Sequence, residues 1–324
     1  MRPALRPLAG AVLLGMLHAL HGAHAAPATP PACPPDTANA HRTFIFDGDK
    51  GCGAVGKYYD ALASAKPDWP SVQRCAAQDR DNVVLMMLYA NGYGVPRDLD
   101  RAIAHACLVD GAQAETEGRL EHLQRMKAGQ DKARFDLCDD ITSGMMGGFC
   151  TDIAENAKAA QRGAALARLG AQLTPVQRTR FAALRKATDA FAQDVGEAET
   201  DMSGTARAAL SIGAQAAVQD ELLADLRAAE GGKLPAGTDG GFAAADKALN
   251  DVYRKVMALP VDEQGRVGYT TVTKQGIRTT QRAWIACRDA WTAFAQARYP
   301  SVPAAAWKTR LTERRTAQLR AWLD

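Results

Sequence analysis

The chain has 324 residues, of which 47% are hydrophobic and only 6% are aromatic. This hydrophobic content can bury at least one core, which excludes a collagen-like or fully disordered chain. The 39 Lys and Arg and 36 Asp and Glu are too evenly balanced for a dedicated nucleic-acid binder. Because Ala is abundant and aromatic residues are scarce, we predict an all-α protein whose helices pack through Ala and Leu.

The first 25 residues have the pattern of a secretory signal peptide. Arg2 and Arg6 precede an apolar run over residues 8–20, and small residues follow up to Ala25. The run is shorter than the roughly 20 apolar residues that a membrane anchor needs. We therefore predict a periplasmic or secreted protein with no membrane span, in which a Pro-rich leader, residues 26–40, follows the signal.

The cysteines favour disulfides over a metal site. In an oxidising compartment the six between residues 33 and 150 predict up to three disulfides, whose pairing the sequence does not decide. Cys138 and Cys150 are the easiest pair to close locally, and Cys287, at helical spacing from two tryptophans, is expected to be a buried thiol. No C-x-x-C motif is present and histidines are few, so no metal site is expected. The disulfide candidates are Cys33, Cys52, Cys75, Cys107, Cys138 and Cys150.

Residues 41–150 form a Cys-rich segment in which a helical hairpin is expected. Apolar residues from Val83 to Tyr89 share one helix face, and a break rich in Gly and Asn covers residues 91–96. Asp98 is then placed to cap a second helix that carries Ala102.

This hairpin resembles the SEL-one-like repeat, a relative of the tetratricopeptide repeat. The resemblance covers residues 83–113 and rests on Leu88, Tyr89, Gly92, Gly94, Val95, Asp98 and Ala102. The preceding stretch, Trp69 to Gln78, resembles the second helix of a degenerate earlier repeat. Because fewer than three repeats rarely stand alone, the resemblance implies a short helical-repeat segment braced by disulfides.

The rest of the chain predicts helical bundle modules. Residues 151–229 are rich in Ala, Leu, Arg, Glu and Gln and predict two or three amphipathic helices, one of them opened by Pro175 after Thr174. Residues 230–241 are rich in Gly and predict a linker to a last module, residues 242–324.

Two features relate the parts on either side of this linker. Residues 181–193 and 284–296 align without gaps and share seven of 13 positions, which predicts two related helical modules, the first one degenerate. Residues 242–324 also carry 14 Lys and Arg against 7 Asp and Glu, whereas the part between the signal and this module is net acidic. The two parts are therefore expected to attract each other.

The last module carries the most specific motifs. Leu249 and Tyr253 share one face of a predicted helix, and Asn250 and Gln281 are expected to form helix-packing hydrogen bonds. A Gln-Arg-Ala-Trp string from Gln281 continues to an Arg-Asp pair, and Leu-Thr-x-x-Arg follows downstream, ending at Arg315. This combination resembles the lysozyme inhibitor LprI-like family of small secreted helical domains, over the C-terminal 80 or so residues.

The same motifs supply the candidate binding residues, which are Trp284, Arg288, Asp289, Arg282 and Arg315. An exposed Arg could enter the acidic cleft of a partner, and a lysozyme cleft offers two carboxylates. Alternatively, Arg288 pairs with an acidic residue of a neighbouring helix, such as Asp246, and holds the bundle together. The loops at residues 260–273 and 298–305 are expected to be exposed, where binding sites are commonly carried.

No nucleophile elbow, phosphate-binding loop or H-E-x-x-H motif is present, so we expect neither an enzyme nor a cofactor. The family resemblance implies a secreted binding protein that protects the cell wall by binding a muramidase, that is, a lysozyme. One alternative is a helical-repeat adaptor of the cell envelope, which would bind another protein. A second is a stress-related protein that binds peptidoglycan or another anionic envelope polymer through the basic tail. The charge of this tail suits such a polymer, whereas a basic lysozyme would repel it.

Overall fold

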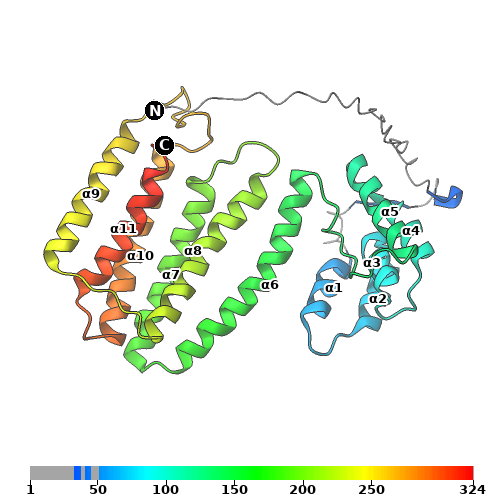
Figure 1. The fold of residues 1–324 in the computed structure, drawn as a ribbon, viewed down its shortest axis with the longest axis horizontal. Helices are drawn as coiled ribbons and strands as arrows, with labels where there is room; N and C mark the ends of the chain where they lie inside the picture. Colours follow the sequence, from blue (N-terminus) through cyan, green and yellow to red (C-terminus); the bar gives the residue numbers. More distant parts are fainter. Residues whose placement is uncertain (1–32, 38–40, 45–50, 324) are drawn as a thin grey trace, which may run out of the picture.

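The computed structural model describes residues 33–37, 41–44 and 51–323, and its helices confirm the all-α prediction (Figure 1). Besides the helices, it contains a 3-10 turn, η1 (Pro35–Thr37), and two short parallel strands, β1 (Thr43–Phe44) and β2 (Val109–Asp110). The predicted signal peptide and most of the leader lie outside the described residues. In the part of the chain that the structure describes, no helix is long and apolar enough to cross a bilayer.

An N-terminal body is built from five helices around one apolar core: α1 (Ala54–Ala63), α2 (Trp69–Asp79), α3 (Asn82–Asn91), α4 (Leu99–Ala106) and α5 (Gln113–Lys127). The predicted hairpin is formed by α3 and α4, which pack together. Gly92 ends α3 in the left-handed region, and the Asp98 carboxylate caps α4 by accepting from the Arg101 N–H at 3.0 Å. The hairpin is thus confirmed, while its SEL-one-like identity stays a prediction.

Three disulfides brace this body, as the cysteine pattern predicts. They join Cys33 to Cys107, Cys52 to Cys75 and Cys138 to Cys150. The first ties the chain near η1 to the end of α4, and the second ties the residues before α1 to α2. Covalent cross-links of this kind compensate for the small core of a short helical segment.

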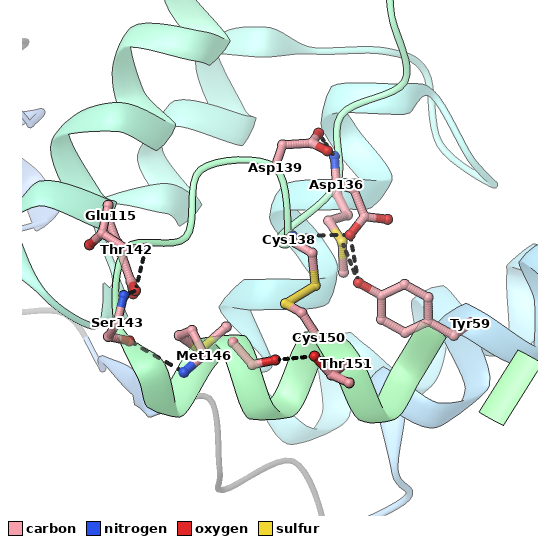
Figure 2. The surroundings of a disulfide bond; sticks show 12 residues. Tyr59, Glu115, Asp136, Cys138, Asp139, Thr142, Ser143, Met146, Cys150 and Thr151 are labelled. Carbon is pink, nitrogen blue, oxygen red and sulfur yellow. Dashed lines mark hydrogen bonds between the residues drawn. A yellow bond between two sulfur atoms is a disulfide. The ribbon is translucent and has the colours of Figure 1, made fainter. Parts of the chain in front are cut away.

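The third disulfide lies at the joint between the N-terminal body and α6 (Gly144–Ala171), as Figure 2 shows. The Glu115 carboxylate accepts from the backbone N–H groups of Thr142 and Ser143, at 3.0 and 2.6 Å. The Ser143 side chain in turn caps α6. Cys138, whose N–H donates to the Asp136 carboxylate, is bonded to a cysteine of α6. The start of α6 is therefore fixed by hydrogen bonds and by a covalent bond.

A C-terminal body contains α6 and five more helices: α7 (Pro175–Ala198), α8 (Arg207–Glu230), α9 (Asp239–Ala258), α10 (Lys274–Arg298) and α11 (Ala304–Arg320). We call α6–α8 the first half and α9–α11 the second half. In each half the first helix packs against the third, and the two middle helices, α7 and α10, pack against each other. Gln177 of α7 donates to the Ala297 carbonyl and Thr280 of α10 to the Asp194 carbonyl, so α7 and α10 run antiparallel.

One core crosses the boundary between the halves. Leu184 and Leu226 of the first half pack in the same cluster as Phe294 and Trp307 of the second. Residues 230–241, expected as a linker, contain the end of α8, a turn at residues 231–232, an irregular stretch up to residue 238 and the start of α9. Packing across this segment makes the two halves one body.

Candidate functional site

Arg288, the arginine of the Arg-Asp pair on α10, packs against two aromatic rings of the second half. The guanidinium carbon of Arg288 lies 5.2 Å from the centre of the Trp284 ring and 5.8 Å from that of Phe242. Its nitrogens bond to the Asp289 carboxylate at 2.9 and 3.0 Å, and one lies 3.8 Å from the Asp246 carboxylate of α9. The side chain is only 13% exposed. The expected alternative, in which Arg288 holds the bundle together, describes this geometry.

Arg315, predicted as a binding residue, lies in the interior. Its side chain is 2% exposed and makes a bidentate pair with Glu199, which follows α7, at 2.5 and 2.9 Å. Its Nε donates to Gln281 of α10 at 2.9 Å. Arg315 thus joins α11 to both middle helices, and a partner does not reach it. Trp284 is also buried, at 5%.

The remaining motif residues divide between core and surface. Leu249 is buried and Tyr253 packs beside it, as their helical spacing predicts. Asn250, expected to bridge two helices, is exposed and donates to Asp246 one turn earlier in α9, so that expectation is wrong. Arg282 and Asp289 are exposed on α10, so these two candidate binding residues are accessible to a partner.

Charges on the two halves are paired with each other. Arg310 and Arg314 of α11 bond to Asp225 of α8 at 2.6 and 2.7 Å. Arg298, near the end of α10, bonds to Glu230 at 2.9 Å, and that bond lowers the pKa of the glutamate. The predicted attraction between an acidic front and a basic tail is therefore confirmed at the level of individual ion pairs.

The C-terminal body contains a small cavity and a larger groove. The cavity, about 50 Å³, lies among α7, α8, α10 and α11 and is lined by Trp284, Trp291 and Cys287 among others. Burial raises the pKa of the Cys287 thiol, which is within 3.4 Å of the Thr188 hydroxyl. Cys287 is thus a packed thiol, as its spacing predicts, and not an activated nucleophile.

The groove, about 530 Å³, lies among the three helices of the first half and has both polar and apolar walls. Its charged lining consists of Arg162 and four carboxylates, Asp152, Glu155, Asp189 and Glu197. Such a surface favours a basic partner over an anionic polymer.

The two loops that were expected to be exposed differ in the structure. The loop after α10 is folded back, because Tyr299 donates to Glu230 at 2.6 Å. The loop between α9 and α10 extends to Tyr269, whose side chain is fully exposed. Sequence reasoning selected the loop and missed this residue.

Sequence reasoning also missed a buried polar group on α5. Glu115 and Arg119 are buried at 0% and 1% exposure. Their segment is so polar that its periodicity gives little sign of burial. Glu115 holds the joint to α6, as described above, which gives this group a structural role.

A known protein family matches the second half of the C-terminal body. The model of the family described as Lysozyme inhibitor LprI matches residues 237–319. Residues 237–319 form an LprI domain. The match confirms the resemblance carried by the Trp284 and Arg288 motif. Neither the curated proteins nor the solved structures include a match to the chain.

The LprI domain corresponds to α9, α10 and α11, while several of its charged partners lie outside it. Glu199 and Asp225, which bind Arg315 and Arg314, belong to the preceding part of the chain. The domain of this chain is therefore completed by the first half of the body.

Proposed function

We propose that the chain is an exported, non-enzymatic binding protein that inhibits a muramidase and so protects the cell wall. The LprI domain at residues 237–319 is the observation that carries this proposal. Three disulfides support it, since such bonds persist in the oxidising space outside the cytoplasm.

The distribution of charge favours a basic enzyme as the partner. Arg298, Arg310, Arg314 and Arg315 already have carboxylate partners within the chain, which weakens the repulsion expected from a free basic tail. The groove of the first half adds acidic surface to the same body. The same internal pairs remove much of the basis for binding an anionic polymer through the tail.

The test is a lysis assay with purified residues 26–324. We expect the chain to slow the clearing of a peptidoglycan suspension by lysozyme, with a dose dependence that saturates near equimolar protein. Reduced and alkylated chain is the control. A lack of protection at about tenfold molar excess would contradict the proposal, because even micromolar binding should register at such doses. Salt-sensitive binding to peptidoglycan alone would favour the polymer-binding alternative.

A further inference from the structure

The loop between α9 and α10 is longer than the fold requires. It has 15 residues, 259–273, whereas the corresponding helices of the first half, α6 and α7, are joined by the three residues 172–174. The same helix arrangement is therefore achieved with a short turn. Ordered loops of this length in compact domains are usually functional.

The base of this loop is fixed in the core. Val267 and Val272 are 5% and 2% exposed, and the Val267 N–H donates to the Val272 carbonyl at 2.8 Å. On the outer side, the Asp262 carboxylate accepts from the Arg266 N–H at 2.8 Å and pairs with its side chain at 2.6 Å. The loop thus has a defined conformation before any partner binds.

The first half of the body braces the loop from outside the LprI domain. The Asp201 carboxylate accepts from the Thr271 N–H at 2.9 Å and from its hydroxyl at 3.1 Å. The Met202 N–H donates to the Thr271 hydroxyl at 2.6 Å. Hydrogen bonds from Ser203 and Thr271 lower the pKa of Asp201 to about 2, so the brace is ionised at neutral pH.

Tyr269 stands at the tip of this braced loop and is 106% exposed, the highest value among the large hydrophobic residues in the described part of the chain that are exposed. Gly268 turns the chain in the left-handed region, at φ +58°, and Thr270 closes the turn by donating to the Val267 carbonyl. An aromatic ring gains little from such a position in the free protein. Rigid, exposed Tyr side chains on ordered loops are the usual anchors of binding surfaces.

We propose that Tyr269 is the anchor of the LprI domain and enters the sugar-binding cleft of the muramidase. This inference rests on the proposed function and names the contact residue. A convex tip with small neighbours, Gly268 and Thr270, suits a concave cleft. The phenol is a flat ring whose apolar face can pack against the walls of a cleft while its hydroxyl forms a hydrogen bond at the edge.

The experiment measures binding of lysozyme to residues 26–324 and compares Tyr269→Ala with the unchanged chain. We expect Tyr269→Ala to raise the Kd about thirtyfold or more, the loss typical of a hot-spot residue. Tyr269→Phe should keep most of the affinity, because the ring is retained. Val176→Ala is the matched control, since Val176 is 67% exposed at the start of α7, far from the loop. It should bind like the unchanged chain.

A second arm adds the trimer of N-acetylglucosamine, which occupies the cleft of the enzyme. It should weaken binding of the unchanged chain by competition. Equal Kd values for Tyr269→Ala and the unchanged chain, or binding that the trimer does not affect, would overturn the inference while leaving the proposed function in place. If the unchanged chain does not bind lysozyme at all, the proposed function itself fails. Circular dichroism melting should show that each variant folds like the unchanged chain.

Discussion

The two halves of the C-terminal body have the same helix arrangement and different connections. In both, the first helix packs on the third and the middle helix faces its counterpart, consistent with the shared pattern of residues 181–193 and 284–296. The first half joins its first two helices by three residues, and the second uses 15. The difference indicates that the helices supply a scaffold and that the long loop carries what is specific to the second half.

Charge also distinguishes the halves. The first half supplies Glu199, Asp225 and Glu230, and the second supplies the arginines that bind them. Because these bonds cross between the halves, neither half has its full set of partners alone. The comparison therefore describes two halves with the same helix arrangement that pack as a single body.

Separating the halves should have the largest effect. Residues 237–324 alone would expose the faces of Trp291, Phe294 and Trp307 that now pack in the shared core. We expect no cooperative thermal unfolding by circular dichroism, because much of the apolar burial would be lost. Residues 144–324, which contain both halves, are the control and should melt cooperatively. A sharp transition for residues 237–324 at the temperature of the control would show that the halves are independent.

Removing the buried ion pair should have the next largest effect. Glu199→Ala leaves the Arg315 guanidinium buried without its carboxylate and should lower the free energy of unfolding by about 3–5 kcal/mol. Urea unfolding measures this loss. Asp251→Ala is the control, because Asp251 pairs with exposed Lys247 and Arg254 and its loss should change the free energy of unfolding far less. Similar losses for both variants would contradict the role of Arg315 in joining the halves.

Two arginines at equivalent positions in the two halves should differ in their contributions to stability. Arg288→Ala removes a side chain packed between Trp284 and Phe242 and should cost about 1 kcal/mol of unfolding free energy. Arg185, its counterpart in α7, is exposed, and Arg185→Ala should change stability by less than about 0.5 kcal/mol. Parallel urea titrations compare them. An equal loss of unfolding free energy in the two variants would contradict the stabilising role given to Arg288.

The smallest effect concerns pH and the brace of the long loop. The pKa of Asp201, about 2, lies below the usual aspartate value of 3.8, so the loop binds the carboxylate form. The contribution of the brace is therefore complete above the unfolded pKa and is lost as the pH falls from about 4 towards 2. Hydrogen exchange at the Thr271 amide, compared with Asp201→Asn, should show protection that declines only in this range. Constant protection down to pH 2 would contradict the assignment.

Local signals in the sequence predict much of this fold. Thr174 and Pro175 predict the start of α7, where the structure has a capping box. Asp98 and Gly92 predict the hairpin of α3 and α4. These features depend on residues a few positions apart, so the chain itself specifies them.

Contacts between distant segments could not be predicted in the same way. Arg315 seemed available to a partner because Glu199 lies 116 residues away in the chain. The Gly-rich segment at 230–241 suggested a linker because composition indicates a turn and not the packing of the helices around it. The 260–273 loop was expected to be exposed, but only the structure shows that Val267 and Val272 are buried and that Tyr269 is outside.

The most direct test of the central claim, that the second half binds a muramidase through a loop the first half holds in place, is hydrogen exchange of residues 26–324 with and without lysozyme. We predict that lysozyme slows exchange most strongly at residues 260–273, around Tyr269. Protection confined to α1–α5, or none under conditions where the two proteins form a complex, would contradict the claim.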